Sequence, residues 1–185
     1  MAQIRFWGVL GRGSAGKSTV IGHLMSRFGA GLNGVDPNKT AMRGRVLLRG
    51  GGYLTFYLRR QSVQEANIGI KEIIDIVNSE LERQQRESPT VTASYLNVLL
   101  ALRLEGINRL PTARRYLNHF VQQGWSIESL VLLNPVPADD YFHRFGAPIL
   151  NVYRPDRPSR LPHSTARGAQ IGTVVGHVRN HFGWA

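Results

Sequence analysis

Residues 11–19 read GRGSAGKST and directly follow the short apolar run IRFWGVL, residues 4–10. The apolar run contains aromatic and β-branched residues and ends in glycines, which is typical of a buried parallel strand. Behind the glycines, residues 18–28 carry apolar side chains at helical spacing and are followed by three further glycines, which predicts a helix that ends there. The stretch therefore predicts a strand, a glycine-rich turn and a helix in direct succession.

The turn fits the phosphate-binding pattern Gly-x-x-x-x-Gly-Lys-[Ser/Thr] at every defined position, namely Gly11, Gly16, Lys17 and Ser18. Glycines let the backbone curl so that its N–H groups point inward, and the start of a helix adds positive potential. We expect Lys17 to reach the β- and γ-phosphates and the Ser18 hydroxyl to bind Mg²⁺. ATP with Mg²⁺ is thus predicted to be bound by Gly11, Gly13, Ser14, Ala15, Gly16, Lys17, Ser18 and Thr19.

The rest of the chain continues the alternation of strands and helices. Strands are predicted at 126–134 and 147–153, and two β-prone pieces, either a hairpin or a strand and a flexible turn, at 45–58. Helices are predicted at 68–85, 95–104, 112–123, 140–145 and 165–182. We therefore expect a single α/β domain over residues 1–185, with a mostly parallel sheet, helices on both faces and a helical lid or insertion at about 60–125.

The composition points to an acidic partner. The 185 residues carry a formal net charge of +11, and 20 of the 23 cationic side chains are arginines. Residues 37–60 hold six cations and no acid, and residues 141–185 hold six arginines and one acid. Two separate basic segments favour nucleic acid as the partner over a small ligand, and DNA over RNA. The alternative explanation of the many arginines is a GC-rich coding genome.

The chain contains no cysteine, which excludes disulfides and thiolate chemistry. No apolar run approaches the roughly 18 residues that span a bilayer. We expect a cytoplasmic protein with no membrane contact. His163 has no partner at metal-ligand spacing, so no metal site built from protein ligands alone is predicted.

Enzymes that hydrolyse ATP with such a loop usually carry an acid at the end of a second apolar strand, where it holds Mg²⁺ and orders water. No such acid is evident here. The strand at 126–134 ends in Asn134, and Asp75 falls within the predicted helix at 68–85. Its absence argues against a motor or a hydrolytic switch.

Asp36 is the acid that stands out instead. It lies just past the first predicted helix, at the start of the basic segment 37–60, which favours its ionised form. It is either a general base that accepts the proton of an attacking hydroxyl, or the first residue of a turn in which Pro37 fixes the bend. Residue type alone favours the turn, whereas the position relative to the glycine loop suits a base, so both roles stay open.

The sequence GVLGRGSAGKST followed by an acid about one helix later resembles the P-loop NTPase superfamily, and within it the kinases of nucleotides and of nucleic-acid ends. This resemblance implies a three-layer P-loop kinase-like fold. It also implies that Asp36 deprotonates the acceptor, that Arg43 binds the acceptor's phosphate, and that Lys17 stabilises the transferring group.

Residues 130–165 resemble the end of phage-type deoxynucleoside monophosphate kinases, through Asp139 or Asp140, Arg154, Pro155, His163 and Ser164. The resemblance implies that Arg154 and Pro155 pack against the adenine, and that the protein is phage-encoded and acts in the host cytoplasm. Asn134 and Val136 depart from it, because those kinases carry an Asp and an Arg at these places, so their acceptor chemistry does not transfer directly.

Two further sets of side chains have an alternative structural role. Arg109, Arg114 and Arg115 form either a lid over the transferring phosphoryl group or the solvated face of a helix. Four aromatic residues interleaved with arginines either stack on bases or belong to the core of the sheet; they are Tyr53, Phe56, Tyr57 and Tyr153.

Together these observations predict a kinase that transfers the γ-phosphoryl group of ATP to a hydroxyl of nucleic acid, such as a hydroxymethylated base in DNA, or of a nucleotide. A deoxynucleoside monophosphate kinase is one alternative. A DNA-binding ATPase of the partition or packaging type is another, and a protein that binds the nucleotide as a structural or regulatory ligand is a third.

Overall fold

The computed structural model describes residues 3–28, 41–87, 95–153 and 166–184, without the side chains of 25–28 and 166–171. The strands are β1 (Gln3–Gly11), β2 (Ala41–Leu47), β3 (Tyr53–Arg59), β4 (Tyr95–Arg103), β5 (Ser126–Leu133) and β6 (Ile149–Val152). The helices are α1 (Lys17–Phe28), α2 (Ile70–Glu87), α3 (Ala113–Gln122), α4 (Ala166–His181) and the 3₁₀ helix η1 (Pro137–Phe145).

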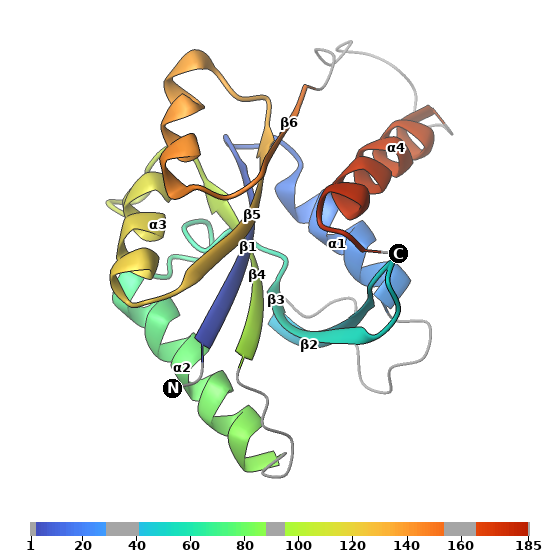
Figure 1. The fold of residues 1–185 in the computed structure, drawn as a ribbon. Helices are drawn as coiled ribbons and strands as arrows, with labels where there is room; N and C mark the ends of the chain where they lie inside the picture. Colours follow the sequence, from blue (N-terminus) through green and yellow to red (C-terminus); the bar gives the residue numbers. More distant parts are fainter. Residues whose placement is uncertain (1–2, 29–40, 88–94, 154–165, 185) are drawn as a thin grey trace.

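The six strands form one sheet in the order β2-β3-β4-β1-β5-β6. All neighbouring strands are parallel except β2 and β3, which form an antiparallel hairpin. Helices α1 and α4 cover one face of the sheet, and α2, α3 and η1 cover the other (Figure 1). The α/β class, the mostly parallel sheet and the helices on both faces are confirmed, and of the two alternatives at 45–58 the hairpin is confirmed.

Successive residues of β1 supply the two halves of the core, because side chains of a strand alternate between its faces. Phe6 packs on Phe120 of α3, and Phe120 stacks on Trp125 with ring centroids 4.2 Å apart. Trp7 points the other way and meets the edge of Phe56, 4.9 Å between centroids. Each face of the sheet thus has its own aromatic cluster.

The prediction of a helix at 95–104 is wrong, because these residues form β4, a strand that lies between β3 and β1. Every residue from Leu96 to Leu102 is buried, because helices cover both faces of the sheet at this point. A strand buried on both faces is apolar throughout and lacks alternation, and its leucines and alanine also favour helix. The stretch 60–125, expected to hold a helical lid or insertion, therefore contributes a central strand.

Among the described residues, no helix combines the length and the apolar character that crossing a membrane requires. The buried aromatic residues of β3, Phe56 and Tyr57, belong to the sheet core. Tyr53 and Tyr153, in contrast, are 70% and 71% exposed. The core alternative is thus confirmed for Phe56 and Tyr57, and base stacking stays a prediction for the two exposed tyrosines.

The packing of α4 on the sheet predicts a pH-dependent stability. Burial lowers the pKa of His181, although backbone carbonyls of Pro148 and Leu130 act in the opposite direction. The imidazole of His181 therefore binds a proton more readily in the unfolded chain than in the folded chain. The free energy of unfolding is then highest above the ordinary histidine pKa of about 6.5, and it decreases as the pH falls from there towards the lower pKa of the folded protein. We expect the His181→Gln variant to lose less stability between neutral and mildly acidic pH than the unaltered protein.

Urea unfolding curves recorded at several pH values test this expectation. His177→Gln is the matched control, because His177 lies exposed on the same helix. An equal pH dependence in the His181→Gln variant and in the unaltered protein would remove His181 as its source.

Candidate functional site

The glycine loop, residues 11–19, connects the end of β1 to the start of α1, as predicted. Ser14 and Gly16 have φ angles of 59° and 89°, so the backbone turns sharply through the left-handed region. A side chain at position 11 would crowd the loop, because a Cβ added to Gly11 would lie 2.9 Å from the Cβ of Ala15. The first N–H groups of α1 have no partner within the helix, and they face a tightly curled loop that suits an anion.

Lys17 lies beneath this loop and is 3% exposed. Its ammonium donates a hydrogen bond to the backbone carbonyl of Arg12, 2.8 Å away, and lies 3.8 Å from the Glu65 carboxylate. Burial lowers the pKa of Lys17, and Arg103 adds to this effect, whereas Glu65 and Glu105 oppose it. A partly desolvated cation is therefore held at the position where the sequence pattern requires one.

Glu105, which sequence reasoning missed, lies directly on the glycine loop. Its Oε1 accepts hydrogen bonds from the backbone N–H of Gly13 at 2.8 Å and from the guanidinium of Arg103 at 2.5 Å. Burial alone would raise the pKa of Glu105, but the hydrogen bonds from Arg103 and Gly13 outweigh it and lower that pKa. An ionised carboxylate thus contacts the loop at neutral pH.

The position of Glu105 follows from β4. This strand pairs with β1 in parallel from Tyr95 to Arg103, so the two strands end at the same edge of the sheet. The backbone N–H of Leu104 donates to the carbonyl of Gly11, which holds the two ends together. The signal in the sequence was the apolar run ending in RLE, and it was lost because the run was interpreted as a helix.

The segment between β3 and α2 completes this side of the site. The side chain of Gln64 is buried and makes two hydrogen bonds to the backbone of Arg103. Its Nε2 donates to the carbonyl at 2.9 Å, and its Oε1 accepts from the N–H at 3.0 Å. The adjacent Glu65 lies 3.8 Å from Lys17 and 3.9 Å from Arg103. Two carboxylates, a lysine and an arginine therefore meet at the loop.

This cluster fits a Mg²⁺–triphosphate ligand. Glu105 Oε2 and Arg103 Nε are buried and, among the described residues, have no hydrogen-bond partner. No group of three or more His, Cys, Asp or Glu side chains that could hold a metal occurs in the described ranges. Mg²⁺ at phosphates needs none, because one or two carboxylates, phosphate oxygens and water complete its shell. Glu105 and the Ser18 hydroxyl are the donors available here.

On the β5 side of the loop, Asp139 of η1 is 8% exposed and accepts two hydrogen bonds. One comes from the backbone N–H of Val136 at 2.8 Å, and the other from the Arg12 guanidinium at 3.2 Å. Arg12 also reaches the carbonyl of Asn134 at 3.4 Å. Asp139 thus caps the start of η1 and ties it to the glycine loop, whereas Asp140 is exposed.

No family model, curated protein or solved structure matches this chain. The site therefore has to be interpreted from its own residues. What they bring together is a curled backbone loop, a buried lysine, an ionised carboxylate and a nearby arginine at the carboxyl ends of adjacent parallel strands. This edge is where open α/β sheets generally bind their ligands.

The structure places the other candidate residues away from the loop or leaves them undescribed. Arg43 lies in β2 and binds Glu80 and Glu87 of α2 at 2.8 and 2.5 Å, and no contact in the described ranges joins it to the glycine loop. Its phosphate role stays a prediction without support from these contacts. Asp36, Arg154, Pro155, His163 and Ser164 lie outside the described residues.

The three lid candidates occupy the segment between the end of β4 and the first turn of α3. Arg109 sits at φ 65° in the tight turn closed by the hydrogen bonds between Ile107 and Leu110. Arg114 and Arg115 are exposed on the first turn of α3. The guanidinium of Arg114 lies 3.7 Å from the ring centre of Tyr141, so its described contact is with η1 and not with the loop.

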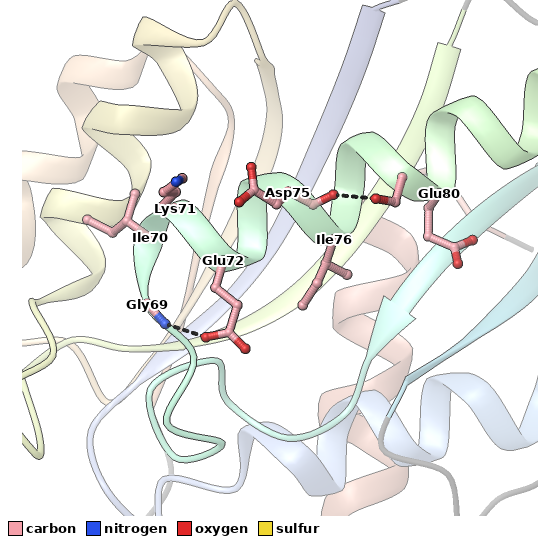
Figure 2. Close-up of a pocket in the computed structure, with 8 residues that line it drawn as sticks. Gly69, Ile70, Lys71, Glu72, Asp75, Ile76 and Glu80 are labelled. Carbon is pink, nitrogen blue, oxygen red and sulfur yellow. Dashed lines mark hydrogen bonds between the residues drawn. The ribbon is translucent and has the colours of Figure 1, made fainter.

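A hollow of about 710 Å³ runs along α2 (Figure 2), and none of the residues that line it belongs to the glycine loop. Its charged lining consists of three carboxylates and one ammonium, from Glu72, Asp75, Glu80 and Lys71. Two isoleucines also line it, and the Ser79 hydroxyl donates a hydrogen bond to the backbone carbonyl of Asp75. A predominance of carboxylates repels a triphosphate. The hollow is therefore a poor alternative to the loop as a nucleotide site.

Proposed function

We propose that this chain is a P-loop nucleoside triphosphatase that binds ATP through the glycine loop. The proposal is supported by the match of the loop to the phosphate-binding pattern, by its place between β1 and α1, and by the buried ammonium of Lys17. Backbone N–H groups and Lys17 would bind the phosphates. Ser18 and Glu105 would hold Mg²⁺, which when bound neutralises charge on the β- and γ-phosphates.

Glu105 is the single observation that favours water as the acceptor. Hydrolysis needs an acid beside the loop to order the attacking water and the metal's water shell. Glu105 is ionised, contacts Gly13, and has one oxygen without a partner among the described residues. The net charge of +11 suits a polyanion, so the function that these residues support best is a DNA-associated ATPase of the partition or packaging type.

Transfer to a hydroxyl is the second candidate. It is favoured by Asp36, an acid one helix beyond the loop at the start of a segment with six cations. In this reaction Asp36 accepts the proton of the attacking hydroxyl, and the arginines bind the acceptor's phosphates. Glu105 would then hold Mg²⁺ without activating water. The acceptor would be a hydroxymethylated base in DNA or a nucleotide.

One experiment separates the two functions. The protein is incubated with γ-labelled ATP and Mg²⁺, in parallel with no acceptor, duplex DNA, hydroxymethylated DNA and a mixture of deoxynucleoside monophosphates. Labelled inorganic phosphate in every reaction, with a faster release on DNA, is expected for the ATPase. Label on an acceptor would overturn hydrolysis as the main reaction and would identify the substrate class.

The Asp36→Asn variant sharpens this comparison. A kinase that uses Asp36 as its base loses about 10²- to 10⁴-fold in transfer rate and keeps its ATP affinity. An ATPase keeps both rate and affinity, because Asp36 then serves only as a turn residue. We expect the second outcome, measured as phosphate release and as equilibrium binding of a fluorescent ATP analogue.

A further inference from the structure

A basic surface lies on α3 and η1, which pack side by side on one face of the sheet (Figure 1). This α3–η1 surface is defined by Arg114, Arg115, Tyr141 and Arg144. Its three arginines are exposed, and none of them makes an ion pair with a carboxylate in the described part of the chain. Residues 106–127 contain no acid at all.

Several arginines outside this surface are paired with acids. Arg12 pairs with Asp139, Arg43 with two glutamates of α2, and Arg103 with Glu65 and Glu105. In η1 the carboxylate of Asp139 is buried and forms an ion pair with Arg12, so Asp140 is the exposed acid of this helix. With three exposed arginines against this one exposed acid, the α3–η1 surface keeps a net positive charge.

Tyr141 holds two of these arginines in place. The guanidinium of Arg114 lies 3.7 Å from the centre of the Tyr141 ring, and that of Arg144 lies 5.2 Å from it. The Tyr141 hydroxyl donates to Asn118 Oδ1 at 3.0 Å, which fixes the ring. Cation–π contacts of this kind restrict the guanidiniums before any ligand arrives, and such preorganisation lowers the entropic cost of binding.

We propose that the α3–η1 surface binds the phosphate backbone of duplex DNA without reading its sequence. Guanidinium groups bind phosphates in a bidentate manner. Proteins that grip single strands rely on aromatic rings that stack on bases, whereas the aromatic ring of this surface is half-buried and already carries guanidiniums. A surface that offers cations and no free ring matches a duplex, whose bases are hidden and whose phosphates are exposed.

The surface is also linked to the nucleotide site, a step that rests on the proposed function. Arg12 belongs to the glycine loop, and Asp139 caps the helix that carries Tyr141 and Arg144. Phosphate binding in the loop would change the surroundings of Arg12, and through Asp139 the placement of η1. We therefore infer that ATP changes the affinity for DNA, and that DNA changes the affinity for ATP by the same factor.

Fluorescence anisotropy with a short labelled duplex tests the first step, and it needs no nucleotide. The double variant Arg114→Ala/Arg144→Ala is compared with Lys71→Ala/Arg86→Ala, which removes the same charge from exposed cations of α2, outside both basic segments. We expect about a tenfold loss of affinity in the first variant only, and a salt dependence weaker by about two units of slope.

Three results would overturn the surface as the DNA site. They are equal losses in both double variants, unchanged binding in the first, and tighter binding of a single strand than of the duplex. Tyr141→Phe keeps the ring and loses only its hydrogen bond to Asn118, so it should weaken DNA binding less than Tyr141→Ala, which removes the ring that positions the arginines. Circular dichroism checks that each variant is folded.

The nucleotide step is measured separately on the unaltered protein, as DNA affinity with and without a non-hydrolysable ATP analogue and Mg²⁺. We expect the two affinities to differ, and the analogue's affinity to shift reciprocally when DNA is added. Binding of the analogue with no effect on DNA would overturn the link alone. Absence of analogue binding would contradict the proposed function, and the anisotropy comparison would still decide on the surface.

Discussion

Replacing Glu105 by Gln is expected to slow ATP hydrolysis by about 10²- to 10³-fold while ATP still binds, because removal of one group that acts on the reacting water and its metal typically costs this much. Glutamine keeps the carbonyl oxygen that can accept the hydrogen bond from Gly13. It removes the negative charge that, in the proposed function, attracts Mg²⁺ and orders water. Phosphate release and equilibrium binding of an ATP analogue, measured on the same preparation, separate the two effects.

Glu82→Gln is the control for this substitution. Glu82 is an exposed acid of α2 and lies outside the cluster at the loop, so the same chemical change there should leave hydrolysis unaltered. A Glu105→Gln variant that hydrolyses ATP at the normal rate would show that Glu105 is a structural partner of Arg103 and Gly13. The hydrolytic proposal would then lose the observation that carries it.

Replacing Lys17 by Ala is expected to weaken ATP binding by about 10- to 10²-fold, since a hydrogen bond from a charged donor contributes about 1.5–3 kcal/mol and each 1.4 kcal/mol is a factor of ten. The fold should survive. Lys17 is 3% exposed, and a buried ammonium is costly to desolvate, while Glu65 retains Arg103 as a neighbour. Isothermal titration with ATP and urea unfolding are the two measurements.

Lys71→Ala provides the matched control, because Lys71 is an exposed lysine at the start of α2. Binding of ATP by Lys17→Ala with normal affinity would contradict the assignment of the loop. The lowered pKa of Lys17 adds a pH signature. Its ammonium is lost as the pH rises through that pKa, so the ATP affinity should fall at a lower pH than for a lysine of ordinary pKa.

The strand, loop and helix from residue 4 to 28 could be predicted because their signals are local. Apolar periodicity, the glycines and the pattern around Lys17 all lie within one short stretch, and the structure forms each element where it was expected. The same holds for α2 and α3, whose apolar residues recur at helical spacing and whose remaining faces are polar.

The acid at the loop could not be found in the same way. Glu105 is close to Gly13 only because β4 lies beside β1, and 92 residues separate the two positions in the chain. The local preferences of its residues predicted a helix at this position. In the structure the segment is the strand β4, which is buried on both faces of the sheet. Arg43 illustrates the reverse case, since the resemblance to kinases implied a phosphate ligand at this position, whereas its neighbours in space are the glutamates of α2.

The two edges of the sheet have a consequence for how copies of this chain meet. A free edge strand is a template for pairing between molecules, and short or charged edges prevent it. The edge strand β6 has four residues, and β2 carries Arg43, Gly44 and Arg45 in its middle. Beyond β2, Leu48 already pairs with Trp184. Neither edge therefore invites strand-to-strand aggregation, even though the central strands are almost wholly apolar.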